Sequence, residues 1–334
     1  MYDLMGKGIV EITALCVENE IAQYKAREIF RFVNQKMVST VDEITILKKE
    51  ERQLFTISSI IPTKVEAGKT ATKVAFELVD GKLIEAVFMD YEDERKSLCI
   101  SAQVGCPIGC QFCATGKMGF TRNLTAAEIV SQVYYFAKEH EISNLVFMGM
   151  GEPFLNYDNV MKAVYILNDD LGINIASRKM VISTIGIIPG INRFAEETKQ
   201  IRLAWSLVAS NDESRKRLIG YKGLPTIAET IAALQNYQEK RGRRITIEYV
   251  LLKGVNDSDQ DLDNFARIAH QLDSHINLIP FNPSSASNFQ RIDPQHARDY
   301  LKALGCNVTV RLSLGQEISA ACGQLCNKSA DLIK

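Results

Sequence analysis

The chain has 334 residues, of which 46% are hydrophobic and 24% charged, and its net charge is −1. These values are ordinary for a globular protein. Because positive and negative charges nearly balance, the protein has no overall electrostatic field that would attract nucleic acid. No apolar run reaches the roughly 18 residues of a membrane span, and the start MYDLMGKGIVEI is unlike a secretory signal. We therefore expect a cytoplasmic protein whose eight cysteines serve metal binding or catalysis rather than disulfides.

Residues 1–62 are predicted to form a small helical accessory domain. Between Glu18 and Lys36, apolar residues recur near helical spacing. The same stretch has a basic side, formed by Lys25, Arg27, Arg31 and Lys36. This side is either a solvated helix face or a surface for nucleic acid, and the sequence leaves both readings open.

Residues 63–91 are predicted to form a β-hairpin and linker. The segments TKVAFELV and KLIEAVFM flank Asp80-Gly81, a dipeptide suited to a type I′ turn. Glu85 lies in the second strand among apolar neighbours. A carboxylate in such a strand is most often an outward-facing residue, so its position alone indicates no function.

From residue 92 to residue 315, apolar strands alternate with helical patterns, which predicts a parallel sheet. The six predicted strands are SLCISAQV, NLVFM, KMVISTIG, IRLAWSLV, ITIEYVLL and HINLIPF. One helix opens with a Thr125-x-x-Glu128 capping box. Six units favour a partial, open (β/α) barrel, with its site at the carboxyl ends of the strands. Several polar or cysteine-bearing positions fall at these strand ends: the loop of residues 106–113, which carries three cysteines, the run GMGEP, Ser183, Ser206 and Asn282.

Three cysteines stand close together as Cys106-x3-Cys110-x2-Cys113. Soft thiolate ligands select zinc, copper(I) or iron–sulfur clusters. A structural zinc site needs four ligands, and no fourth cysteine or histidine stands nearby. A cubane cluster held by three thiolates would keep one iron open to another ligand. The alternatives are a zinc site and three unrelated buried cysteines.

The run GMGEP, Gly149 to Pro153, follows a strand directly, and its glycines would let a ligand approach the backbone. Alone it is a weak signal. Together with the cysteine loop and its Phe112, the run resembles the corresponding motifs of radical S-adenosylmethionine (SAM) enzymes. The runs FCATGKMGFTRNL, STIGIIP, EYVLLKGVND, NLIPFNP and AACGQL, with Cys99 upstream, resemble the RlmN/Cfr family of RNA adenine methyltransferases between Leu83 and Leu325.

This resemblance implies an α/β fold, a partial (β/α)6 radical SAM barrel, followed by a C-terminal segment, 316–334, that carries Cys322. It implies a [4Fe-4S] cluster on Cys106, Cys110 and Cys113, and two SAM molecules per turnover. It also implies SAM contacts from a set of residues beside the strand ends: Gly151, Glu152, Ser183, Ser206, Leu207, Val208 and Asn282. At Val208 the family usually carries His, so a side-chain contact there is lost.

The resemblance further implies a two-cysteine mechanism. Cys322 takes a methyl group from one SAM, and a radical made from a second SAM removes hydrogen from that S-methyl group. The resulting methylene radical adds to adenine, and Cys99 then attacks the Cys322 sulfur, leaving a Cys99–Cys322 disulfide. Glu85 matches the family's proton acceptor, and Cys99 is its rival for that role.

We therefore expect methylation of carbon 2 of an adenine in 23S rRNA, with tRNA as an additional candidate substrate. The alternatives are methylation of carbon 8, another RNA target, and a non-catalytic iron–sulfur RNA-binding protein. Expected partners are RNA and an electron donor such as flavodoxin or ferredoxin, and the protein is expected to be a monomer. A basic run could grip phosphates or form a solvated helix end: Lys240, Arg241, Arg243 and Arg244.

Overall fold

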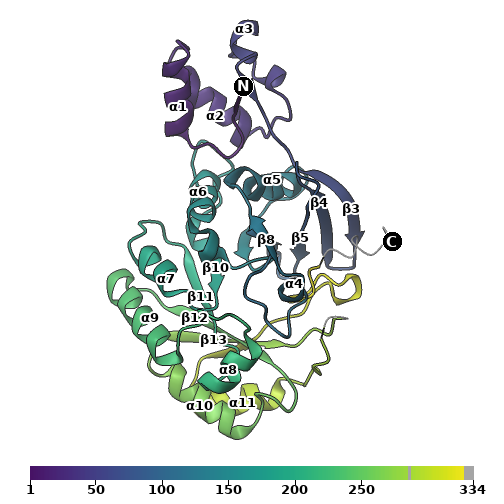
Figure 1. The fold of residues 1–334 in the computed structure, drawn as a ribbon, viewed down its shortest axis with the longest axis vertical. Coiled ribbons are helices and arrows are strands. Elements are labelled where there is room, and N and C mark those ends of the chain that lie inside the picture. Colours follow the sequence, from purple (N-terminus) through teal and green to yellow (C-terminus); the bar gives the residue numbers. More distant parts are fainter. Residues whose placement is uncertain (285–286, 327–334) are drawn as a thin grey trace.

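A ten-stranded mixed sheet organises the molecule, and the computed structural model describes residues 1–284 and 287–326 of it. The strand order is β14-β13-β12-β11-β10-β9-β6-β5-β4-β3. Its two parts are a parallel, barrel-like half and an antiparallel extension, with a helical N-terminal part beyond them (Figure 1). In the described residues, no helix is long and apolar enough to cross a membrane.

All six predicted barrel strands are present and run parallel. A seventh parallel strand, β14 (Val308–Val310), extends the sheet beyond them. The six are β6 (Lys96–Cys99), β9 (Asn144–Phe147), β10 (Met180–Thr184), β11 (Arg202–Ser206), β12 (Ile245–Leu251) and β13 (Ser274–Pro280). The expected α/β fold with a partial barrel is confirmed.

Amphipathic helices cover the outside of the barrel strands (Figure 1). They are α5 (Ala126–Ala137), α6 (Tyr157–Leu167), α7 (Ile188–Ala195), α8 (Asp212–Leu218), α9 (Ile227–Arg241), α10 (Asp259–Ala269) and α11 (Gln295–Ala303). The predicted capping box of α5 is present, because Thr125 accepts from the Glu128 amide and Glu128 accepts from the Thr125 amide. Such caps satisfy amide groups that the first helical turn leaves unpaired.

The N-terminal part contains α1 (Ile9–Glu18), α2 (Lys25–Asn34) and α3 (Lys49–Arg52), and β1 (Tyr2–Asp3) pairs with β2 (Phe55–Thr56). The helical pattern expected between Glu18 and Lys36 is realised only in α2, since Glu20 has a positive φ of 55° and ends the preceding turn. Lys25 is buried and bonds to Glu51 at 2.7 Å, so it does not belong to an exposed basic side.

The antiparallel extension has three strands where a hairpin was predicted: β3 (Ile61–Ala67), β4 (Ala71–Glu77) and β5 (Leu83–Asp90). Strand β3 was missed because it is almost fully exposed and contains Pro62, which suits an edge strand. The predicted type I′ turn is wrong, since only Gly81 of the pair has a positive φ, 73°. The Gly81 amide bonds back to Leu78, so the connection is a three-residue loop closed by a glycine bulge.

Candidate active site

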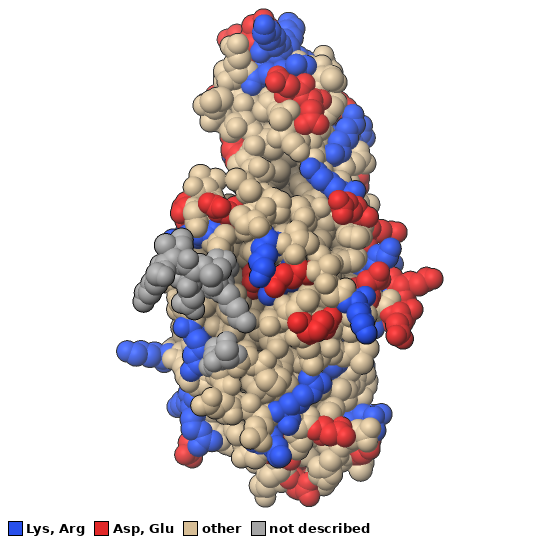
Figure 2. Space-filling model, turned by 90° about the vertical axis from the view of Figure 1, so that its right-hand side faces the viewer, with Lys and Arg blue, Asp and Glu red and all other residues tan. Residues whose placement is uncertain are grey.

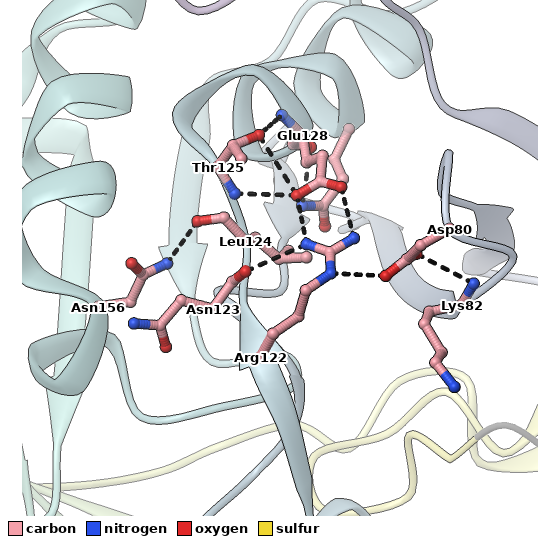
Figure 3. Close-up of polar contacts among 9 residues, drawn as sticks. Asp80, Lys82, Arg122, Asn123, Leu124, Thr125, Glu128 and Asn156 are labelled. Carbon is pink, nitrogen blue, oxygen red and sulfur yellow. Dashed lines mark hydrogen bonds and ion pairs between the residues drawn. The ribbon is translucent and has the colours of Figure 1, made fainter.

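The cysteine loop is held at its base by a short ribbon of β7 (Gln103–Gly105) and β8 (Phe120–Asn123). Arg122 on β8 donates to both carboxylate oxygens of Glu128, at 2.9 and 2.8 Å, and to Asp80 at 2.7 Å (Figure 3). The Arg122 hydrogen bond lowers the pKa of Asp80 to about 2. Through these contacts, Arg122 ties the β7–β8 ribbon below the cysteine loop to the turn of the extension and to the first turn of α5.

Cys106, Cys110 and Cys113 line one pocket at the carboxyl ends of the strands. Burial raises the pKa of all three thiols, that of Cys106 to about 12. In the described part of the chain, no three His, Cys, Asp or Glu side chains converge as ligands of a single ion. A cubane does not require this, because each cysteine binds a different iron. Three thiols that line one pocket, with Cys110 buried and Cys106 and Cys113 partly buried, fit such a cluster.

The GMGEP turn contributes Gly149, Gly151 and Glu152 to the lining of this pocket. Gly151 has a φ of 104°, and a Cβ there would lie 2.6 Å from the side chain of Gln103. The Glu152 carboxylate is buried and accepts the amides of Phe154 at 3.1 Å and Ile185 at 3.0 Å. Burial raises the pKa of Glu152 to about 7. Glu152 therefore lines the pocket as an acceptor suited to an ammonium group.

Two predicted serines meet on neighbouring strands. The hydroxyl oxygens of Ser183 and Ser206 are 3.1 Å apart, and Ser183 donates to Glu248 of β12 at 2.9 Å. Both serines and Glu248 line the pocket.

The remaining residues expected to contact SAM differ in whether they line the pocket. Leu207 is fully buried outside the pocket, so any SAM contact there would come from its backbone. Val208 does line the pocket, but with a φ of 69°, which is strained for a β-branched residue. Asn282 lines it as well and donates to the Cys322 carbonyl at 3.1 Å.

Cys322 stands at the junction of two cavities. It lines the pocket of the three cysteines, and it also lines a smaller adjoining cavity together with Cys99 and Arg311. Both thiols are free. Burial raises the pKa of Cys99 to about 12. Residue Cys322 is exposed, but desolvation of its sulfur raises the thiol pKa to about 11, and the nearby Arg311 opposes both increases.

Glu85 lies outside both cavities. It is buried, 3.4 Å from the Lys73 ammonium, and it accepts the Cys326 amide at 2.9 Å. Burial raises the pKa of Glu85 despite the opposing Lys73 charge. The carboxylate thus contacts the C-terminal segment four residues beyond Cys322.

Three functional candidates escaped the sequence reasoning: Glu248, Arg311 and Lys73. Each is a charged residue inside an apolar strand or directly after one, and each pairs with another charge. A charged residue within an apolar strand, or directly after one, is the sequence pattern that could have pointed to them. Isolated charges in strands are usually outward-facing, however, and only the packed fold shows that Lys73 and Glu248 are buried and that Arg311 is largely so.

The basic run of Lys240 to Arg244 lies at the amino ends of the strands, opposite the pocket. Lys240 pairs with Glu196, Arg241 donates to backbone carbonyls of Glu197 and Lys199, and Arg244 pairs with Asp273 at 2.9 Å. On the face shown in Figure 2, acidic and basic side chains are interspersed. The partners of Lys240, Arg241 and Arg244 do not favour this run as the main RNA surface.

Known proteins resemble this chain in sequence and in fold. The model of the radical SAM superfamily matches residues 100–266, so the fold and the cysteine loop define a radical SAM enzyme. A radical SAM methyltransferase of Sphaerobacter thermophilus has a crystal structure that superposes with a TM-score of 0.92 at 40% identity, covering 97% of this chain and 99% of that one.

Two curated relatives narrow the assignment. The chain is 42% identical to the ribosomal RNA large subunit methyltransferase N of Nitrosopumilus maritimus, over 94% of this chain and 95% of that protein. It is also 42% identical to the "probable dual-specificity RNA methyltransferase RlmN" of Staphylococcus aureus strain JH9, over 92% of this chain and 88% of that protein. The chain belongs to the RlmN family of radical SAM RNA methyltransferases.

Proposed function

We propose that this enzyme methylates carbon 2 of adenine in 23S rRNA and in tRNA, with Cys322 as the methyl carrier. The relatives' names, a large-subunit rRNA methyltransferase and a dual-specificity RNA methyltransferase, support these substrates. The observation that carries the proposal is the place of Cys322, which borders both the three-cysteine pocket and the cavity of Cys99. One sulfur in that position could receive a methyl group on one side and meet a resolving thiol on the other.

Cys106, Cys110 and Cys113 would hold the [4Fe-4S] cluster, which supplies the electron for reductive cleavage of SAM. Glu152 would accept the SAM ammonium, and the Ser183–Ser206 pair would bind its polar groups. The apolar lining, which includes Phe147, Ile279 and Phe281, would keep water from a radical. Two SAM molecules per turnover are part of this proposal, because the methyl group and the radical come from separate molecules.

In this proposal, Cys99 would act as the resolving thiol. In that step its sulfur attacks the Cys322 sulfur, the bond from Cys322 to the methylene carbon breaks, and a Cys99–Cys322 disulfide forms. The electron pair of the broken bond goes to the methylene carbon, which takes a proton and becomes the new methyl group. Two thiols lining one small cavity are the arrangement that this exchange needs.

Glu85 remains our candidate for accepting the proton from the adenine ring. Its raised pKa favours a protonated final state, which suits an acceptor. In this structure its carboxylate contacts the Cys326 amide and Lys73 instead of the cavities. The role therefore requires the C-terminal segment to shift, whereas Cys99 already lines the cavity beside Cys322.

Nucleoside mass spectrometry of rRNA and tRNA from cells with and without the gene would test the proposal. The expected result is 2-methyladenosine in both RNA classes only when the gene is present. Finding 8-methyladenosine instead would assign the other ring carbon, and unchanged nucleosides in both classes would refute this substrate assignment.

A further inference from the structure

The outer side of the cysteine loop borders a surface groove that is separate from the reaction pocket. Gln111 and Lys117 line this outer groove together with Arg217 and Gly254. Cys110 and Phe112, the neighbours of Gln111 in sequence, line the inner pocket. A single thickness of backbone therefore separates the outer groove from the place where the cluster would sit.

The wall between groove and pocket is well supported. The Gln111 amide donates to the Leu218 carbonyl at 2.9 Å, which ties the loop to the end of α8. A Cβ at Gly220 would lie 3.0 Å from the Gly109 carbonyl oxygen, so the two backbones pack closely there. The Lys117 ammonium bonds to the Gln111 side chain. These contacts hold the loop as a fixed, thin partition.

Two cationic side chains line the outer groove, Lys117 and Arg217. Further exposed lysines lie next to its lining residues in sequence or in the loop that follows α8: Lys216, Lys222 and Lys253. None of these five side chains forms an ion pair with a carboxylate in residues 1–284 or 287–326. This contrasts with the paired basic run at the other end of the barrel. Unpaired positive charge around a concave surface favours an acidic partner.

We propose that the outer groove is the docking surface for an acidic flavoprotein electron donor of the flavodoxin class. The inference rests on the proposed function only in requiring one external electron for each SAM cleaved. That electron would leave the donor's reduced flavin and cross the partition at Gln111 to reach the cluster, with no bond made or broken in the protein. RNA must reach Cys322 in the inner pocket, on the other side of the loop, so the groove suits a second partner.

Binding of recombinant oxidised flavodoxin to the cluster-loaded enzyme tests this directly. The Lys117→Gln/Arg217→Gln variant should bind about 5- to 10-fold more weakly at low ionic strength, as expected for two exposed charges. The difference should shrink at high salt. The Lys240→Gln/Arg244→Gln variant removes the same charge from the far end and should bind like the parent. A second variant, Lys216→Gln/Arg217→Gln, leaves the cysteine loop untouched and should weaken binding similarly.

Turnover with two reductants separates this proposal from the proposed function. The groove variants should lose activity with reduced flavodoxin but keep parental activity with dithionite, which needs no docking. Loss of RNA affinity with unchanged flavodoxin binding would make the groove an RNA surface and overturn the proposal. Unchanged flavodoxin binding and unchanged RNA affinity would also overturn it. If the parent methylates no RNA with either reductant, the proposed function fails, while the binding result still decides the docking surface.

Discussion

Arg311 and Glu248 form a largely buried ion pair, with 3.2 Å between Nη1 and Oε1, where the segment leading to Cys322 meets the barrel. The second Glu248 oxygen accepts from Ser183, which in turn lies 3.1 Å from Ser206. Arg311 also faces the cavity of Cys99 and Cys322. The pair thus connects the expected SAM-binding serines with Cys99 and Cys322.

Removing one member of this pair should be costly. We expect Arg311→Met to lower the free energy of unfolding by about 3 to 5 kcal/mol, because Glu248 would remain as an uncompensated buried charge. Adding Glu248→Gln should recover part of that loss. Denaturant unfolding would measure both. Arg298→Met, which breaks an exposed pair with Asp299, is the control and should cost less than about 1 kcal/mol; an equally small cost for Arg311→Met would contradict the prediction.

Two glycines with nearly the same φ form a matched test of the ribbon under the cysteine loop. Gly105 has a φ of 74° and Gly81 a φ of 73°. A Cβ at Gly105 would collide with the Gly119 carbonyl, whereas a Cβ at Gly81 meets nothing. Gly81→Ala should therefore cost only the backbone strain, about 1 kcal/mol. Gly105→Ala should cost clearly more and should also reduce the iron bound after reconstitution; equal losses in both variants would rule out the clash as the cause.

Glu152 should make SAM binding depend on pH. Its pKa of about 7 means that the carboxylate, which attracts the SAM ammonium, forms as pH rises through that value. SAM affinity should therefore increase from acidic toward alkaline pH and then level off. Glu152→Gln should bind more weakly at the alkaline end. The SAM amino group titrates identically with both proteins, so only the difference between their pH profiles reports on Glu152, and parallel profiles would refute the assignment.

The same pKa shift has a consequence for stability, with a defined sign. The folded pKa of Glu152 is raised above the ordinary value of 4.5. Its contribution to stability is thus fully present below pH 4.5 and is lost as pH rises through about 7. Unfolding of the parent and of Glu152→Gln across this range would show whether the parent loses more stability than the variant.

The roles proposed for Cys322 and Cys99 predict different phenotypes for their alanine variants. Cys322→Ala removes the methyl carrier, so we expect neither methylated RNA nor an adduct. Cys99→Ala removes the resolving thiol and should trap RNA on Cys322, visible as protein that migrates with RNA and returns to its normal position after nuclease treatment. Cys16→Ala, at a buried cysteine outside both cavities, controls for simple loss of stability. Normal turnover by Cys99→Ala would exclude the two-cysteine mechanism.

The basic run at the amino ends of the strands should contribute little to RNA binding. If it gripped phosphates, neutralising Lys240, Arg241 and Arg244 would lower the slope of log affinity against log salt by about two to three. Its ion pairs and its distance from the pocket end lead us to expect an unchanged slope. RNA-binding titrations over a salt series would decide, and a decrease of that size would restore the run as an RNA contact.

The features that could be predicted from sequence are those with local signals. The apolar strands and the Thr125 capping box each have a signal within a few residues, and both are found where expected. The cysteine spacing is also a local signal, and the three cysteines line one pocket. The turn type was missed because Asp80 uses its carboxylate to accept from Arg122 and Lys82, which fixes a different loop. Such a contact, 42 residues away in sequence, has no local pattern.

Local sequence patterns also do not show which charged side chains are buried. Glu248 and Arg311 look like ordinary strand charges until β12 and the segment after β14 are brought together. The resemblance alone points to Glu85, and its place outside the cavities depends on how residues up to Cys326 fold back. Leu207 likewise followed its neighbours in the motif, although its side chain points into the core.

The two ends of the ten-stranded sheet bear on how the protein behaves when concentrated. At one end, β3 places Pro62, Lys64 and Glu66 along an exposed strand with a bulge between Pro62 and Lys64. At the other end, β14 is only three residues long. A missing amide hydrogen, side-chain charges, a local kink and a short edge all oppose the addition of a strand from another molecule. The sheet can therefore be long without becoming a template for aggregation.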